Sequence, residues 1–385
     1  MSNRKGASLM ATLYQRARLL QGLLDTREAK TGPFYVDVDL TERCNLQCLG
    51  CLYHSPRMCS DFRANRTDMR DLPFEMFTRL CNDLASLGTR QLILQGTGEP
   101  LLHPQLVEII AYAKQRGFHV TLLTNGTLLD AVRAGELVGV GLDSIKISLW
   151  AASAEQYERN YPGNGGDTFH TVVDGLRAMV AARRGSSSPR VSVYHIITKY
   201  NCGQLDAMFD LATSIGIDGL YFSPLCDPRG SLEEFMPTTG QQCRILGWLR
   251  SARPRLRAMG LHENIGQCLL RYRTPKPLSH YSPCYIAWFH ARIRLNGLVE
   301  ACGRCGGRAP FGDLKVSSFS DIWNGPAIQA FRRQTMTHQG LARLEDRCYC
   351  AMCYYVHEIL AVHRHFRWLR PLALARRRGN AEGVA

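Results

Sequence analysis

The sequence contains no apolar run close to the roughly 20 residues that a membrane-spanning helix requires. The N-terminus also lacks the apolar core of a secretion signal, because Arg16 and Arg18 interrupt its apolar stretch. Acidic residues are few: 33 Asp and Glu stand against 47 Lys and Arg. These absences exclude a membrane-spanning helix and predict a cytoplasmic protein whose basic surface attracts an acidic partner.

Cysteine, in contrast, is abundant, with 15 in 385 residues. In a chain without an export signal, this number indicates reduced thiols and metal ligation rather than a disulfide scaffold. The 45% hydrophobic and 21% charged content is typical of a globular protein. The length accommodates one large domain, or one large and one small domain.

Three of the cysteines, Cys44, Cys48 and Cys51, follow each other with the spacing C-x3-C-x2-C. They come directly after residues 34–40, whose alternating apolar and polar side chains predict a half-buried strand. Three thiolates this close together can hold three corners of a 4Fe–4S cluster and leave the fourth iron open. A structural zinc site with His54 as the fourth ligand is the alternative.

Helical and strand patterns alternate regularly between residues 34 and 225. Six repeated β/α units predict parallel strands joined by right-handed helical crossovers. A doubly wound sheet is the competing architecture at this point. The predicted strands cover residues 34–40, 90–95, 119–123, 144–149, 190–198 and 219–222, and the helices cover 73–87, 104–117, 128–138, 169–184 and 204–215.

Residues suited to ligand binding lie where three of these strands end. Gly96 and Gly98 allow the backbone to approach a ligand closely, and Glu99 can accept a charge-assisted hydrogen bond from an ammonium group. Asn125 follows the next strand, and Ser148 lies near the end of the fourth. Each also has an ordinary interpretation, as part of a turn or as a hydrogen-bonded strand residue.

A second group of cysteines follows a proline-rich linker. Residues 292–302 predict a β-hairpin that turns at Asn296-Gly297. Separated cysteine pairs brought together by a hairpin and a helix can hold an iron–sulfur cluster or zinc. The group consists of Cys284, Cys302, Cys305, Cys348, Cys350 and Cys353.

The triple-cysteine spacing and the Gly96-Thr-Gly98-Glu99 segment resemble the signature of the radical S-adenosylmethionine (SAM) enzymes. The resemblance implies a partial (β/α)6 TIM-like barrel, a 4Fe–4S cluster on Cys44, Cys48 and Cys51, and SAM bound by Gly96, Gly98, Glu99, Asn125 and Ser148. One residue departs from the family pattern. The position before the third cysteine is usually aromatic and packs near the adenine, but here it is Gly50.

The later cysteines resemble the SPASM/Twitch extension of these enzymes, a small α+β domain that binds auxiliary iron–sulfur clusters. Because no cysteine follows Cys353, we expect one auxiliary 4Fe–4S cluster, held by Cys284, Cys302, Cys350 and Cys353. Cys305 and Cys348 are then left over. The alternatives are that they are buried thiols near the cluster, that one of them displaces an assigned ligand, or that they are hydrogen donors to a substrate radical.

The expected organisation is an N-terminal amphipathic helix in residues 1–33, the barrel in 34–228, a connecting helical segment and linker in 229–282, the SPASM/Twitch domain in 283–355 and a basic tail in 356–385. The tail mixes apolar residues with arginines. It can lie on an anionic membrane surface, or pack as a helix with a solvated basic end.

The resemblance implies that SAM is cleaved reductively to a 5′-deoxyadenosyl radical that abstracts hydrogen from a substrate, with flavodoxin or ferredoxin as electron donor. Because Cys44 lies too near the start for an N-terminal peptide-recognition domain, we expect a small molecule: a sugar, an aminocyclitol or a glycan precursor. We expect an oxidation assisted by the auxiliary cluster. Alternatives are an epimerase with a cysteine hydrogen donor, a ribosomal peptide maturase and, from another class, a zinc-containing nucleic-acid-binding protein, for which no recognised binding module is found.

Overall fold

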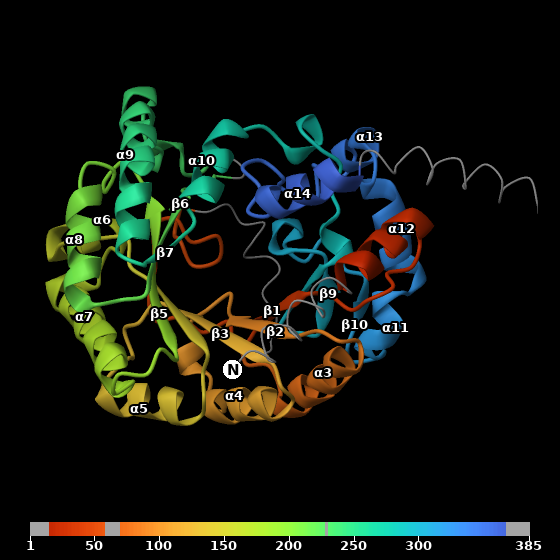
Figure 1. Ribbon diagram of the computed structural model, residues 1–385, viewed down its shortest axis with the longest axis horizontal. Helices are drawn as coiled ribbons and strands as arrows, with labels where there is room; N and C mark the ends of the chain where they lie inside the picture. The colour runs from red at the N-terminus through yellow and green to blue at the C-terminus, as the bar shows by residue number, and fades with distance from the viewer. Residues whose placement is uncertain (1–14, 58–69, 228–229, 367–385) are drawn as a thin grey trace, which may run out of the picture. The chain divides into compact units, whose positions relative to one another are not determined.

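The computed structural model describes residues 15–57, 70–227 and 230–366, which fall into two compact units (Figure 1). Of the described residues, the barrel unit comprises 37–57, 70–78, 91–227 and 230–275, and the auxiliary unit comprises 15–36, 79–90 and 276–366. The domain boundaries expected at residues 33, 228, 282 and 355 stay predictions.

The barrel unit is built on a parallel sheet with the strand order β1-β2-β3-β4-β5-β6-β7. Neighbouring strands from β2 to β7 pair in parallel. The order is linear among the described strands, so this sheet forms a partial barrel. The strands are β1 Tyr35–Asp39, β2 Gln91–Gln95, β3 His119–Thr124, β4 Ser144–Ser148, β5 Arg190–Ile197, β6 Gly219–Pro224 and β7 His262–Glu263.

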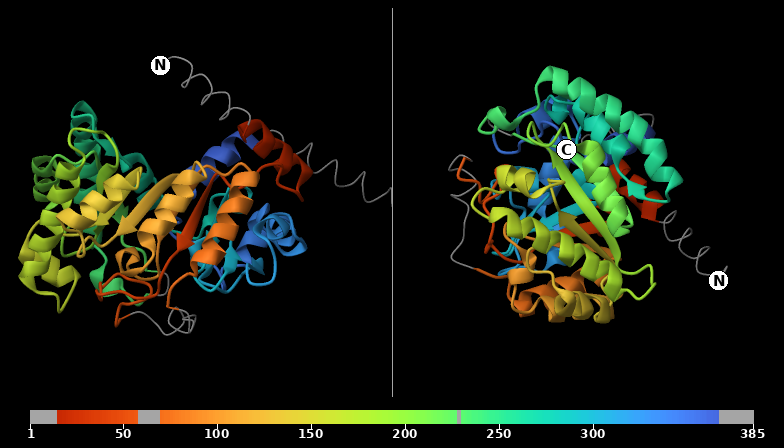
Figure 2. Two further views of the ribbon diagram at one scale, coloured as in Figure 1. Left: turned by 90° about the horizontal axis from the view of Figure 1, so that it is seen from below. Right: turned by 90° about the vertical axis from the view of Figure 1, so that its left-hand side faces the viewer.

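Helices follow the strands and cover them with their apolar faces. Figure 1 shows α4, α5, α7 and α8 along the outer side of the strands, and Figure 2 shows the same layer from two further directions. The alternation predicted from the sequence is therefore confirmed for all six β/α units. The helices and turns are α3 Phe74–Ser86, η1 Pro100–Leu102, α4 Leu106–Gln115, α5 Ala131–Gly139, α6 Ala154–Asn160, α7 Gly165–Ala182, α8 Leu205–Ile215, η2 Glu233–Phe235, α9 Thr239–Ala258 and α10 Ile265–Arg273.

Beyond the sixth unit, the sequence pattern fades but regular structure continues. Helix α9 begins with a capping box, in which the Thr238 side chain and the Gln241 side chain each bond the other residue's backbone. Strand β7 then pairs in parallel with β6 as a short seventh strand. The segment expected as a helical connection and linker is therefore largely a further β/α-like unit.

The auxiliary unit contains the predicted hairpin. Strands β8 (His290–Ile293) and β9 (Leu298–Glu300) pair antiparallel, and Gly297 supplies the left-handed turn with a φ of 90°. Residues 15–25 form a helix in the same unit. The other elements are η3 Leu278–His280, η4 Ile286–Trp288, η5 Gly303–Cys305, β10 Gly312–Asp313, α11 Phe319–Trp323, α12 Pro326–Thr335, α13 His338–Ala342 and α14 Val356–Phe366.

The basic tail is described only as far as helix α14, and residues 367–385 lie outside the described residues. The first half of the expected N-terminal helix, residues 1–14, also lies outside them. Within residues 15–57, 70–227 and 230–366, none of the helices has the length and apolar character needed to cross a membrane.

His195 is a buried ionisable group of strand β5. Its side chain is 1% exposed, and its ring stacks on Phe222 with centroids 5.5 Å apart. Neither ring nitrogen has a hydrogen-bond partner with good geometry in the described part of the chain. Burial lowers the pKa of His195 from 6.5 to about 3, although the nearby Leu149 backbone opposes the shift. The residue is therefore held neutral in the core.

We expect the stability of the protein to fall when the solution is acidified below the ordinary histidine pKa, in part because of His195. The pKa is lower in the folded than in the unfolded chain, so the unfolded chain binds more protons between about pH 6.5 and pH 3. The free energy of unfolding should drop by about 2 kcal/mol from pH 7 to pH 5 through this one group.

Chemical denaturation at both pH values measures this effect. His195→Leu should reduce the difference between the two pH values by that amount, whereas replacing the exposed His119 with Gln serves as the matched control. An unchanged pH dependence in His195→Leu would contradict the assignment.

Candidate functional site

A cavity of about 270 Å³ lies at the carboxyl ends of the strands of the barrel unit. Its wall includes one residue from the end of each of four consecutive strands: Gln95, Leu123, Ser148 and Ile196. The further lining residues are Cys44, Leu46, Cys48, Gly50, Cys51, Leu52, Tyr53, His54, Gly96, Thr97, Gly98, Glu99, Pro100, Thr124, Asn125, Trp150 and Tyr161. The eight predicted residues of the first cysteine motif and of the SAM contacts therefore line one cavity.

The three cysteines of the first motif are brought together on the loop after β1. Their sulfur atoms lie close enough to interact electrostatically with one another, and those of Cys44 and Cys48 also with Glu99. Burial raises the pKa of Cys44 to about 11 and raises that of Cys48 as well. Such thiols stay protonated until a metal displaces the proton.

Backbone amides point at the sulfur of the third cysteine. The amides of Tyr53 and His54 donate to Cys51 Sγ over 3.4 and 3.3 Å. Amide donors of this kind stabilise a thiolate and tune the potential of an iron–sulfur cluster. In the described part of the chain, no three Cys, His, Asp or Glu side chains gather at the spacing of a single metal ion. Three thiols and these amides suit a larger sulfur-ligated cluster.

The cysteine loop is joined directly to the loop that follows β2. The Gly98 amide donates to the Thr41 carbonyl over 2.9 Å, and the Glu99 amide donates to the Arg43 carbonyl over 2.7 Å. A Cβ atom added to Gly98 would lie 2.1 Å from the Arg43 carbonyl oxygen. Gly98 is therefore required so that the two loops can approach each other.

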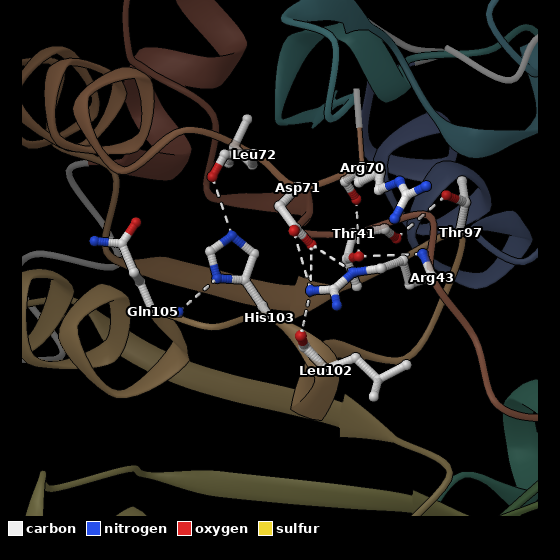
Figure 3. A network of polar contacts seen from close by, with 9 residues as sticks. All are labelled: Thr41, Arg43, Arg70, Asp71, Leu72, Thr97, Leu102, His103 and Gln105. Atoms are coloured by element: carbon white, nitrogen blue, oxygen red, sulfur yellow. Dashed lines mark hydrogen bonds and ion pairs between the residues drawn. The ribbon is translucent and has the colours of Figure 1, made fainter. Parts of the chain in front are cut away.

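The side chain of Arg43 reinforces this joint (Figure 3). Its guanidinium group binds both carboxylate oxygens of Asp71, at 2.9 and 3.0 Å, and also the carbonyl oxygen of Leu102. His103 continues the network, because its ring bonds the Leu72 carbonyl over 3.0 Å. Arg43 thus ties the residue next to Cys44 to the turn that follows Glu99.

Glu99 is 2% exposed, and its carboxylate accepts three hydrogen bonds from the chain. The donors are the Thr124 hydroxyl, the Leu101 amide at 2.9 Å and the Asn125 amide at 2.7 Å. Burial raises the pKa of Glu99 against these bonds. A carboxylate offers about four acceptor positions, so one is left for a cationic group in the cavity.

The side chains of Asn125 and Ser148 differ in their hydrogen bonding. The Asn125 side chain bonds Asn45 of the cysteine loop over 2.9 Å, and it accepts from the Thr127 amide over 2.9 Å. Asn125 therefore ties the third strand to the cysteine loop as well as lining the cavity. The Ser148 hydroxyl makes no hydrogen bond within the described residues and lines the cavity directly.

The second cysteine group forms a separate site in the auxiliary unit. Cys284, Cys302, Cys350 and Cys353 interact electrostatically with one another, so the structure brings the four predicted ligands together. Burial raises the pKa of Cys302 to about 12, and raises that of Cys284 and Cys350. Four buried thiols are the donor set that a 4Fe–4S cluster requires.

Arg304 links the two parts of this auxiliary site. Its guanidinium group donates to the carbonyls of Ala351 and Met352, over 2.9 and 2.8 Å, and lies 4.2 Å from the centre of the Tyr354 ring. The segment after the hairpin is thereby attached to the segment that carries Cys350 and Cys353.

Cys305 and Cys348 correct the sequence-based expectation. The structure joins them in a disulfide, buried against Leu344, with Phe331 and Cys350 packed around it. Neither sulfur carries a hydrogen in a disulfide, so the expected role as hydrogen donors is wrong for this form of the protein.

Sequence reasoning missed four residues of the first site: Arg43, Asn45, Thr124 and Trp150. Three of them are direct neighbours of predicted site residues, since Arg43 and Asn45 flank Cys44 and Thr124 precedes Asn125. Their chain position was the available signal. Trp150 lies two residues after Ser148, and the packing of its ring is described below.

Family models match both parts of the chain. A model described as the radical SAM superfamily matches residues 38–212, and a model described as an iron–sulfur cluster-binding domain, SPASM, matches residues 284–354. The first contains Cys44, Cys48, Cys51 and Glu99, and the second contains the auxiliary cysteines.

Curated relatives include the mycofactocin maturase MftC of Mycobacterium ulcerans, which is 31% identical over 222 residues, covering 56% of this chain and 55% of that protein. The PqqA peptide cyclase of Granulibacter bethesdensis is 24% identical over 319 residues, covering 78% and 76%. The chain spans about half the length of the first curated relatives that it matches.

Among solved structures, Streptococcus suis SuiB bound to the precursor peptide SuiA has a TM-score of 0.62 at 14% identity, covering 81% of this chain and 71% of that one. This likeness supports the fold, a partial barrel followed by a cluster-binding domain. The fold, the two cysteine sites and the matched models agree, and this chain belongs to the radical SAM superfamily, with a 4Fe–4S cluster and SAM as its cofactors and a C-terminal SPASM domain for auxiliary iron–sulfur clusters.

Proposed function

We propose that this radical SAM enzyme modifies a peptide by an oxidation that begins with abstraction of a hydrogen atom. The observation that supports the chemistry is the single cavity shared by three cysteine thiols, Glu99 and the open hydroxyl of Ser148. The observation that supports the substrate class is the similarity to the PqqA peptide cyclase, which covers 78% of this chain and 76% of that protein.

The residues of the cavity have distinct roles in this proposal. Cys44, Cys48 and Cys51 hold the 4Fe–4S cluster, while Glu99 binds the amino group of SAM and Ser148 binds its ribose. When bound, the cluster and SAM supply a one-electron cleavage that yields the 5′-deoxyadenosyl radical. The protein orients the substrate carbon and keeps water away from it.

A peptide substrate is favoured over the sugar, aminocyclitol or glycan precursor expected from the sequence. That expectation depended on the distance of Cys44 from the start of the chain, which does not bear on recognition by a separate protein. The mycofactocin maturase and the PqqA peptide cyclase are among the relatives of this chain, and the SuiB structure of similar fold is bound to a precursor peptide.

Oxidation is favoured over epimerisation by the state of the leftover cysteines. An epimerase requires a thiol that returns a hydrogen atom to the substrate. Cys305 and Cys348 were the candidates, and both are bound in the disulfide. The four auxiliary thiols Cys284, Cys302, Cys350 and Cys353 instead suit a cluster that can take up an electron.

Anaerobic reconstitution tests the cofactor assignment. The intact enzyme should hold about eight irons and form 5′-deoxyadenosine from SAM after reduction, as two 4Fe–4S clusters require. Changing Cys44, Cys48 and Cys51 together to Ala should abolish cleavage and leave about four irons. Zinc in place of iron, without cleavage, would contradict the proposal.

Glu99→Gln tests the SAM contact separately from the cluster. The amide keeps an acceptor oxygen but loses the negative charge, so the dissociation constant of SAM should rise by about tenfold or more. The iron content should stay that of the unaltered enzyme. Glu108→Gln, on helix α4, is a matched control. Unchanged SAM binding in Glu99→Gln would remove Glu99 from the site.

The substrate class can be tested with a low-molecular-weight extract of the host organism. The extract should accelerate 5′-deoxyadenosine formation by the reduced enzyme, and digestion with a broad-specificity protease should remove the acceleration. The modified peptide should be lighter by the mass of two hydrogen atoms. Acceleration that survives proteolysis but is lost after glycosidase treatment would instead support the small-molecule interpretation.

A further inference from the structure

Because Gly50 has no side chain, Leu225 and Trp150 can pack close to its backbone. A Cβ atom added to Gly50 would lie 2.7 Å from Cδ1 of Leu225, and 3.3 and 3.4 Å from two ring carbons of Trp150. Gly50 and Trp150 both line the cavity that holds the three cysteines. Leu225 and the indole ring of Trp150 therefore share the space beside the third cysteine that a side chain at residue 50 would need.

The backbone of Trp150 is fixed from three sides. Its carbonyl oxygen accepts from the side-chain amides of Asn160 and Asn201, over 3.0 and 2.9 Å. Its amide donates to the Tyr161 hydroxyl over 3.2 Å. The Trp150 and Tyr161 rings also lie 5.3 Å apart. A ring held in this way is preorganised, so a ligand that binds against it loses little further freedom.

Among the described residues, the indole N–H of Trp150 is not hydrogen-bonded in this arrangement. Trp150 is 6% exposed, and its Nε1 has no hydrogen-bond partner within the described residues. A buried donor without a partner destabilises the protein, by an amount that an acceptor on a bound molecule would recover. Packing alone explains the ring, because a tryptophan is mostly apolar, but it does not explain a buried N–H beside a ligand cavity.

The residues that line the cavity are of two chemical kinds. Glu99 and the three cysteines are polar or suited to bind metal, whereas Leu46, Trp150, Tyr161 and Ile196 supply apolar and aromatic surface. SAM has the same division, with a charged amino acid at one end and a flat heteroaromatic base with ring-nitrogen acceptors at the other. An aromatic wall with a spare N–H donor matches the base.

We infer that Trp150, and not the residue before the third cysteine, forms the surface against which the adenine of SAM binds, and that the absence of a side chain at Gly50 leaves the room that Trp150 shares with Leu225. This inference rests on the proposed SAM site. It assigns the adenine contact of this chain to the segment after β4 instead of to the cysteine loop.

Binding measurements on the anaerobically reconstituted enzyme test the inference without turnover. The ligands are SAM, S-adenosylhomocysteine and free methionine, of which the first two carry adenine and the third does not. Trp150→Ala should raise the dissociation constants of SAM and S-adenosylhomocysteine by about tenfold or more, which is the order that stacking of a base on an aromatic ring contributes. The affinity for methionine should change little. Trp150→Phe should lose less affinity for SAM and S-adenosylhomocysteine than Trp150→Ala does.

A double variant places the aromatic ring where the family usually has it. Gly50→Phe combined with Trp150→Ala should recover part of the affinity for S-adenosylhomocysteine that Trp150→Ala loses. Trp248→Ala is the matched control: this tryptophan of α9 packs on Phe222, also has an unpartnered N–H among the described residues, and does not line the cavity. Iron content reports whether each variant folds.

The outcomes separate this inference from the proposed function. One contrary result is that Trp150→Ala loses equal affinity for methionine and S-adenosylhomocysteine, and another is that it loses no affinity for either. Each of these results would overturn the role of Trp150 while leaving the SAM site in place. If the unaltered enzyme binds no SAM, the proposed function fails first and the inference fails with it.

Discussion

The active site depends on two backbone hydrogen bonds between the cysteine loop and the loop that follows β2. They join Gly98 to Thr41 and Glu99 to Arg43, with no room for a side chain at Gly98. One loop carries the three thiols proposed to hold the cluster, and the other carries Glu99, which we propose binds the SAM amino group. Binding of SAM to the open iron through its amino acid end would require the two loops to keep a constant separation. A rigid backbone joint, closed by Arg43 and Asp71, achieves this better than flexible side chains do.

Much of the barrel and of both metal sites could be predicted from the sequence. The strands read as alternating or continuous apolar runs with helical patterns between them, and this regularity gives the parallel topology directly. The cysteines of both sites were predicted as ligands because thiols in close sequence spacing can have few other purposes in a chain of this kind. The structure groups Cys44, Cys48 and Cys51 in one place, and Cys284, Cys302, Cys350 and Cys353 in another.

The features that the sequence did not reveal depend on contacts between distant segments. Helix α9 buries Ile245, Leu249 and Leu256 on a narrow face, so its apolar signal is weak, and β7 is only two residues long. Arg43 contacts Asp71, which lies 28 residues away in the sequence, and Trp150 lies beside Gly50, which is 100 residues away in the sequence. The pairing of Cys305 with Cys348 likewise depends on how the hairpin and the terminal cysteines come together. None of these pairs has a local pattern that marks it.

The disulfide has a practical consequence for loading the auxiliary site with iron. It lies against Cys350, one of the four thiols assigned to the cluster. A strong thiol reductant opens a disulfide by exchange, which here would put two additional thiolates beside the assembling cluster. Iron delivered in that state can bind any of six cysteine sulfurs instead of four. The order in which iron, sulfide and reductant are added therefore decides which sulfurs hold the metal.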